Sequence, residues 1–309
     1  MKHLSRLLLL CFFLNSFLVE AQSTINPQNI EIVRDSFGVP HIFAPTDAEV
    51  AYGLAWATLE DDPKTTQFLL NAAQKYSGRT MGVDGAAIDY AAYLLQLDRV
   101  VEERYKKDVS PEFKKILEAY AEGANAYAKK HPEDVILKKA FPLTPKDILV
   151  GYMLGQSLMV GIDGVLKAIN DNEILDRDEE RLDTLGTGSN SFAFNSNKTK
   201  SGEVFLAINS HQPLEGILSW YEVHLHSDEG WNIVGGLFHG AVSIFHGTNE
   251  NLGWAHTSNG FDKIDVFQLE MHPSKKLMYK VDGEWLKLEK NTAMCGERYK
   301  IHRSQCGSD

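Results

Sequence analysis

Cysteine is scarce in this chain: only three are present in 309 residues, and Cys11 lies in the N-terminal apolar run. The other two, Cys295 and Cys306, stand in a polar stretch near the C-terminus. They could pair in an oxidising compartment, but the sequence alone leaves that pairing open. A fold held by many disulfides is excluded, so a buried core must supply most of the stability.

Long apolar runs are missing after the first 21 residues, and none approaches the roughly 20 residues that a membrane helix needs. Residues 1–21 begin with basic side chains, continue with a short apolar stretch and end in small residues, which is typical of an export signal. We therefore predict a signal peptide at 1–21 and a secreted, periplasmic mature protein without a membrane segment.

Clusters of basic residues are also absent, and the net charge is -11. Phosphate recognition needs grouped Lys and Arg side chains, so the composition argues against a nucleic-acid partner. Chemistry on a small molecule is the favoured class of function.

The region 22–170 is predicted to be mainly helical. Residues 30–43 first alternate in polarity around a Gly-Val-Pro break, which predicts a strand, a turn and a strand. Apolar residues then recur at helical spacing, and Pro111 and Pro145 stand at favourable helix starts. The stretches with this spacing are 48–58, 63–76, 86–105, 111–130 and 153–159.

The pattern changes in the second half of the chain. Residues 171–183 hold seven acids and two arginines, so 171–188 is predicted to be a spacer or linker. From Ser189 to the end at 309 the chain is strand-rich, although 291–309 lose strand patterning. The predicted strands are 192–194, 203–209, 220–226, 231–235, 242–246 and 252–256. Helices followed by an antiparallel sheet predict a layered α+β fold rather than a doubly wound parallel sheet.

The junction Gly188-Ser189-Asn190 lies where the acidic stretch ends and the strands begin. By composition such a triplet is more often a turn than a nucleophile. A serine hydroxyl becomes reactive when a base accepts its proton, and a serine at a new N-terminus can use its own α-amine.

Five motifs resemble the penicillin acylase family of N-terminal-nucleophile hydrolases, in the order in which that family has them. They are VRDSFGVPHI at 33–42, AYGLAWA with EDD at 51–62, YAEGANAY at 120–127, GSN at 188–190 and NLGWAHT at 251–257. This resemblance implies a layered αββα arrangement, incomplete at the C-terminus here, and a precursor that cuts itself between Gly188 and Ser189. The products would be an α chain and a β chain that remain partners.

The same resemblance implies an amide hydrolase for N-acylated small molecules such as penicillins or acyl-homoserine lactones. Ser189 would be the nucleophile and its α-amine the base, with no cofactor for catalysis. His211 would contact the nucleophile, as in the acyl-homoserine lactone acylase branch, and the backbone N–H of Ser258 would serve the oxyanion. A strand-end histidine bonded to backbone is the alternative for His211. The apolar helix at 151–160 would form part of the acyl pocket.

A structural Ca²⁺ site is also implied by the resemblance. Its ligands would be Asp262, the carbonyl of Ile264, Asp265 and Glu173. Two acids near a strand are more often a solvated edge.

Two rival hypotheses remain. Six of the eleven histidines fall between His211 and His256, and the pair His224 and His226 would share one face of a strand, as in a zinc-dependent hydrolase. Alternatively the chain is an inactive truncated fragment, because the resemblance implies a longer β chain with an oxyanion-hole asparagine beyond Asp309.

Overall fold

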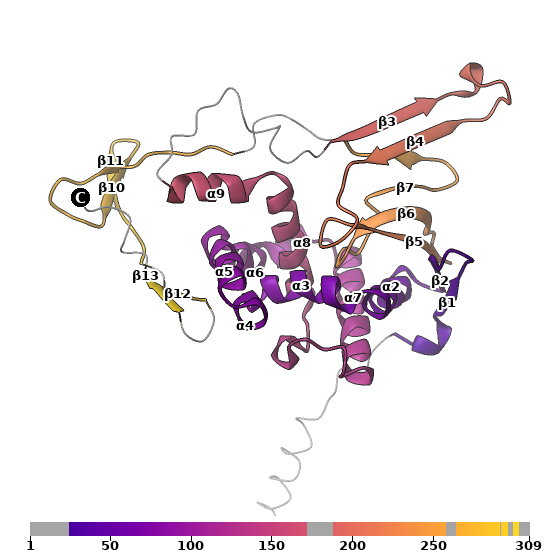
Figure 1. Ribbon diagram of the computed structural model, residues 1–309, viewed down its shortest axis with the longest axis horizontal. Helices are drawn as coiled ribbons and strands as arrows, with labels where there is room; N and C mark the ends of the chain where they lie inside the picture. The colour runs from indigo at the N-terminus through magenta and orange to yellow at the C-terminus, as the bar shows by residue number, and fades with distance from the viewer. Residues whose placement is uncertain (1–24, 172–187, 258–263, 291, 296–298, 303–309) are drawn as a thin grey trace, which may run out of the picture.

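The computed structural model describes residues 25–171, 188–257, 264–290, 292–295 and 299–302, and all structural statements concern these residues. Helices dominate up to Asn170 and strands dominate from Ser189, which confirms the α+β class. Figure 1 shows the helices gathered on one side of the main sheet. The described helices are the 3-10 turns Pro27–Asn29, Lys138–Ala140 and Ser196–Lys198, and α2 (Asp47–Asp61), α3 (Pro63–Ala73), α4 (Ser77–Met81), α5 (Val83–Leu95), α6 (Leu97–Asp108), α7 (Pro111–Lys130), α8 (Pro145–Met159) and α9 (Ile162–Asn170).

The described strands form one large sheet and three small ones. The large sheet has the order β1-β2-β5-β6-β7-β8, with β1 (Glu31–Arg34), β2 (Pro40–Ala44), β5 (Trp220–Ser227), β6 (Asn232–Phe238), β7 (His246–Thr248) and β8 (Gly253–Trp254). The small sheets are β3 (Ser189–Phe194) with β4 (Phe205–Ser210), β9 (Glu270–Met271) with β10 (Met278–Val281) and β11 (Glu284–Lys287), and β12 (Thr292–Cys295) with β13 (Tyr299–His302).

Local sequence signals explain where several helices begin. The side chain of Thr46 accepts the N–H of Glu49 at the start of α2, and Ser110 accepts the N–H of Phe113 at the start of α7. Thr144 and Asp147 form a capping box in front of α8, with Pro145 in the first turn. Such caps satisfy helix N–H groups that have no partner within the helix. The predictions for 111–130 and for a helix start at Pro145 are confirmed.

Helix α2 lies at the centre of the fold, between the sheet and α7. Two glycines permit the close packing on its two sides. A Cβ atom at Gly53 would lie 2.7 Å from the Ile42 side chain on β2, and a Cβ atom at Gly123 of α7 would lie 2.4 Å from the carbonyl oxygen of Tyr52. The motifs around residues 51–57 and 120–127 are therefore the two surfaces of one helix contact.

One face of the large sheet packs on these helices. In β5 the residues Val223 and Leu225 are fully buried, whereas His224 and His226 alternate with them on the opposite, partly exposed face. Leu54 and Tyr120 in the helices are also fully buried in the same core. The period-two pattern of β5 thus follows from one covered and one open face.

The opening motif is held by Arg34. Its guanidinium bonds Asp61 at 2.8 Å and Glu60 at 2.9 Å, both at the end of α2, and Tyr221 of β5 donates its hydroxyl to the same Asp61 at 2.6 Å. The carboxylate of Asp35 accepts the N–H groups of the turn that follows. The sequence motifs at 33–42 and 60–61 therefore join β1, α2 and β5.

The structure corrects the predicted helix at 86–105. It is two helices, α5 and α6, because Gln96 between them adopts a left-handed conformation with φ of 51°. The separate α4 and α9 were not predicted. The N–H of Gln96 still bonds the carbonyl of Ala92, and the spacing of apolar residues does not indicate the break.

The predicted strands from 189 to 256 pair antiparallel, as expected, but they are divided between the large sheet and a separate β3–β4 hairpin. Strand β2 from the first half of the chain pairs with β5 in parallel, so the large sheet is mixed. The predicted strand at 242–246 is mostly a buried turn ahead of β7, and 252–256 contains only the short β8. Residues 291–309, expected to lack strands, contain β12 and β13.

Among the described residues, no single helix has the length and hydropathy of a membrane span. The consecutive helices α8 and α9 pass that test only together, and they are bent by 70° at the break between them.

We predict that Gly123→Ala destabilises the fold by about 1–3 kcal/mol, because the new methyl group would overlap the carbonyl of Tyr52 and push α7 from α2. Thermal unfolding followed by circular dichroism measures the effect. The matched control is Gly155→Ala in α8, where a Cβ atom would make an ordinary 3.9 Å contact with Leu69. Equal loss of stability in the two variants would contradict the packing role of Gly123.

Candidate functional site

The peptide bond between Gly188 and Ser189 is surrounded by donors directed at its carbonyl. The hydroxyl of Ser189 bonds the Gly188 oxygen at 2.5 Å, and the backbone N–H of His211 donates to the same oxygen at 3.0 Å. The His211 N–H could stabilise negative charge on this oxygen, and the Ser189 hydroxyl lies beside the same carbonyl group. The serine predicted from the sequence and His211 are therefore brought together on one bond.

The β3–β4 hairpin creates this arrangement. Ser189 is paired with Ser210 in the register of the two strands, so the next residue, His211, reaches Gly188. Residues directly opposite in an antiparallel pair share a face, which places Ser189 and Ser210 on the same side of the hairpin. In Figure 1 the far end of the hairpin extends away from the helical layer.

The His211 ring lies close to Gly188. Its Nε2 faces the side-chain amides of Asn190 and Asn209, each at 3.3 Å, and accepts from them. A Cβ atom at Gly188 would stand only 3.2 Å from His211 Nδ1. The histidine of the sequence analysis is thus neither free nor bonded by its ring to the serine hydroxyl, and its ring leaves little room for a side chain at position 188.

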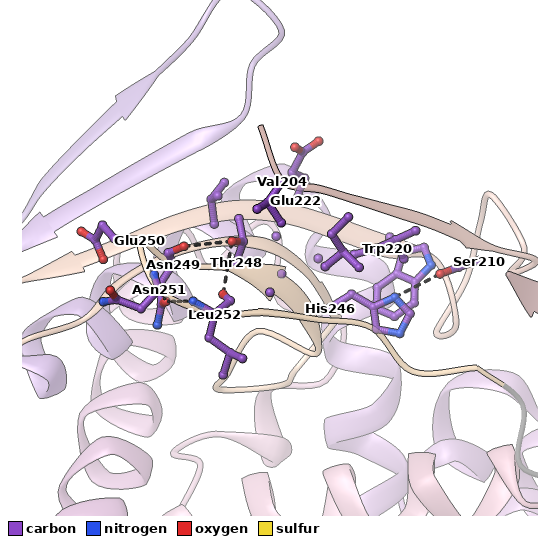
Figure 2. A pocket seen from close by; sticks show the side chains of 17 residues that line it. Val204, Ser210, Trp220, Glu222, His246, Thr248, Asn249, Glu250, Asn251 and Leu252 are labelled. Carbon is purple, nitrogen blue, oxygen red and sulfur yellow. Dashed lines mark hydrogen bonds between the residues drawn. The ribbon is translucent and has the colours of Figure 1, made fainter. Parts of the chain in front are cut away.

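A cavity of about 790 Å³ opens between the hairpin and the open face of the large sheet. Figure 2 shows its side chains, with Ser210 and His246 at one end and Thr248 to Leu252 towards the other. Apolar side chains dominate its wall, and the lining includes Val204, Leu206, Ile208, Trp220, Val234 and Leu252. A mainly apolar cavity with a few polar groups suits an apolar organic ligand.

Helix α8, expected to form part of an acyl pocket, does not line this cavity. Leu154 of α8 is 2% exposed and belongs to the core, while Val160 just after the helix is 40% exposed. The sequence analysis did not predict the strand residues that line the cavity. The apolar side chains at the alternate positions 204, 206 and 208 could have indicated them.

Other predicted site residues are only partly placed. Ser258, Glu173 and Asp262 lie outside the described residues. Ile264 is half-buried and Asp265 is exposed. Since two of the four expected calcium ligands are not described, the fit of a Ca²⁺ ion to this set remains a prediction.

The histidine pair proposed for zinc has other partners. His224 Nδ1 lies 3.0 Å from His41 Nδ1, and its Nε2 lies 2.8 Å from the Asn232 side-chain oxygen. His226 shares this face of β5, with ring centroids 6.3 Å apart. Both nitrogens of His224 are therefore engaged within the protein.

Within the described part of the chain, one group of three side chains has ligand atoms close enough for a metal ion. It consists of His131, Glu133 and Asp134, which follow α7. Asp134 already accepts the hydroxyl of Tyr127 at 2.7 Å. His224 and His226 are not part of such a group, so the zinc-hydrolase alternative has no support from the described geometry.

Comparison with known proteins identifies a family and several proteins to which this chain is similar. Residues 29–297 match the family described as penicillin amidase. The acyl-homoserine lactone acylase PvdQ of Pseudomonas fluorescens strain Pf-5 is 25% identical over 294 residues, covering 85% of this chain and 37% of that protein. The acyl-homoserine lactone acylase QuiP of Pseudomonas fluorescens strain Pf0-1 is 24% identical over 321 residues, covering 84% of this chain and 38% of that protein.

A solved thermostable penicillin G acylase from Alcaligenes faecalis is 22% identical, with a TM-score of 0.31, over 41% of this chain and 72% of that one. The chain thus spans 37% and 38% of the length of the two curated relatives.

Proposed function

Because this chain belongs to the penicillin amidase family, we propose that it carries the nucleophile of a hydrolase that cleaves the amide bond of N-acylated small molecules. The observation that supports this most is the Gly188 carbonyl, which accepts hydrogen bonds from both the Ser189 hydroxyl and the His211 N–H. The Ser189 hydroxyl thus lies beside the carbonyl group that it would attack. The layered αββα arrangement of N-terminal-nucleophile hydrolases is part of this proposal.

The first reaction is self-cleavage. Ser189 Oγ attacks the carbonyl carbon of Gly188, an Oγ–C bond forms, and the His211 N–H stabilises the oxyanion. The C–N bond to Ser189 then breaks, and the hydroxyl proton ends on the released α-amine. Water hydrolyses the resulting ester, which leaves the Gly188 carboxylate and a free N-terminal Ser189. We propose that 171–188 is a spacer and that the two chains stay associated.

The second reaction uses the new N-terminus. The α-amine of Ser189 accepts the hydroxyl proton, through a water molecule, while Oγ attacks the amide carbonyl of the substrate. The amine product leaves with that proton, and water then releases the acid from the acyl-enzyme. We propose that the backbone N–H of Ser258 contributes to the oxyanion site and that Ca²⁺, if bound through Asp265 and its neighbours, is structural.

The cavity beside the hairpin favours an apolar acyl group. Leu206, Ile208 and Trp220 supply apolar surface next to Ser210, the residue paired with Ser189. The relatives named acyl-homoserine lactone acylases support an aliphatic acyl chain over an aromatic one. We further propose export through residues 1–21 and action in the periplasm, where such compounds can be reached from outside the cell.

We predict cleavage between Gly188 and Ser189, and its loss in Ser189→Ala together with loss of amide hydrolysis. The control is Ser191→Ala, which removes a hydroxyl from the same face of β3 but leaves the nucleophile. Intact mass and N-terminal sequencing of the purified proteins measure cleavage. An uncut chain that hydrolyses amides, or equal losses in the two variants, would show that Ser189 is not the nucleophile.

We predict that Gly188→Val slows cleavage on the order of 10- to 100-fold, because its side chain would displace the His211 ring and misalign the carbonyl. Gly188→Ala should have a smaller effect. Adding His211→Ala to Gly188→Val should restore much of the rate, since the ring is removed while the backbone N–H stays. A time course of the cut fraction on denaturing gels tests this, and failure of the second change to help would refute the steric explanation.

We predict that the processed protein hydrolyses N-acyl amides with long aliphatic acyl groups faster than those with phenylacetyl groups. The reason is the apolar wall of the cavity beside Ser210. A panel of N-acyl homoserine lactones, penicillins and acyl p-nitroanilides, assayed with and without a chelator, provides the comparison. A preference for short polar acyl groups would contradict an acyl-binding role of the cavity. Loss of turnover on removal of zinc alone would instead support a zinc-dependent hydrolase.

A further inference from the structure

In the part of the chain that the structure describes, one side-chain hydrogen bond joins the β3–β4 hairpin to the large sheet. Ser210 Oγ of β4 lies 3.2 Å from His246 Nδ1 of β7, as Figure 2 shows. Among the hydrogen bonds of the described residues, no other connects strands β3 and β4 to the large sheet. The orientation of the hairpin on the sheet therefore depends on this bond and on apolar contacts such as that of Leu206 with Gly253.

The hydrogen bond at Nε2 of His246 determines which ring nitrogen carries the proton. Nε2 is 3.2 Å from the backbone nitrogen of His256, which can only donate, so Nε2 carries a lone pair. The neutral ring must then hold its proton on Nδ1 and donate it to Ser210. Burial lowers the pKa of His246, and the neighbouring His256 lowers it further, which favours this neutral form.

The proton on Nδ1 excludes a role for His246 as the base that activates the Ser210 hydroxyl. A serine beside a histidine suggests a nucleophile and its base, but a base must present a lone pair to the hydroxyl. His246 presents N–H to Ser210 instead. Ser210 is thus an acceptor held in place, whereas the hydroxyl of Ser189 bonds the carbonyl oxygen of Gly188.

Ser210 lies next to the bond between Gly188 and Ser189 that is proposed to be cleaved. Ser210 is the register partner of Ser189, and His211 directly after it donates its N–H to the Gly188 carbonyl. A shift of Ser210 would therefore move both the strand that bears the nucleophile and the donor that stabilises the oxyanion. Misplacement by about 1 Å can cost on the order of 100-fold in rate.

We infer that His246 is a positioning residue for Ser189: by donating Nδ1–H to Ser210 it holds the end of β4 so that the His211 N–H and the Ser189 hydroxyl meet on one carbonyl. This inference rests on the proposed function, because it concerns the same nucleophile. His246 has no contact with the reacting atoms, and its effect passes through Ser210.

The experiment compares His246→Phe, His246→Asn, Ser210→Ala and the pair His246→Phe with Ser210→Ala. The control is His226→Phe, the same exchange on β5. Two rates are measured: self-cleavage at Gly188–Ser189 by intact mass, and kcat and KM for decanoyl p-nitroanilide in the fraction that has been cut. Thermal unfolding of each variant reports separately on stability.

His246→Phe is expected to slow self-cleavage and to lower kcat about 10- to 100-fold. Because His246 also lines the proposed acyl cavity, a change in KM does not bear on the inference, and self-cleavage, which involves no bound substrate, decides it. His246→Asn should recover most of both rates, because its amide nitrogen can donate to Ser210 from the place of Nδ1. Ser210→Ala should match His246→Phe, and the double variant should be no worse, since both changes remove one bond. His226→Phe should behave as the unchanged protein.

Wild-type cleavage and kcat in His246→Phe, or losses that add in the double variant, would overturn the inference. A loss of melting temperature without a change in kcat of the cut enzyme, or without rescue by asparagine, would assign His246 a purely structural role and also overturn it. Failure of the proposed function is distinguishable, because it requires Ser189→Ala to stay active. An inactive Ser189→Ala beside a normal His246→Phe would refute the positioning role alone.

Discussion

The close packing of α2 between the large sheet and α7 is the constraint on which the rest of the structure depends. Gly53 lets α2 approach β2, and Gly123 lets α7 approach the backbone of Tyr52. Side chains larger than hydrogen at these positions would separate the layers. This packing fixes the position of β2. Strand β5 pairs with β2 in parallel, and β6 and β7 follow β5 in the same sheet.

The candidate site inherits its geometry from that sheet. His246 on β7 bonds Ser210, and Ser210 is opposite Ser189, so the position of Ser189 is connected to the core through two strands. The carbonyl of Gly188 faces two donors, the Ser189 hydroxyl and the His211 N–H. In the proposed function, the reactivity of this bond is a consequence of strand register.

The many histidines of the second half of the chain are better explained by this architecture than by a metal. His211 accepts from two asparagines, His224 bonds His41 and Asn232, and His246 bonds Ser210. His239 is buried beside Thr66, and burial lowers its pKa. His224 and His246 use both ring nitrogens for bonds within the protein, which needs no ion.

The sequence by itself determined the features that depend on near neighbours. The caps Thr46, Ser110 and Thr144, the prolines at helix starts and the alternation of β5 all act within a few residues, and the GSN junction could be identified from its flanking motifs. Tertiary structure alone decided the break at Gln96, the parallel pairing of β2 with β5 and the contact of Ser210 with His246. His41 and His224 are 183 residues apart in sequence. Periodicity records which face of an element is buried, but it does not record which distant element covers that face, because the partner is chosen by the packing of the whole core.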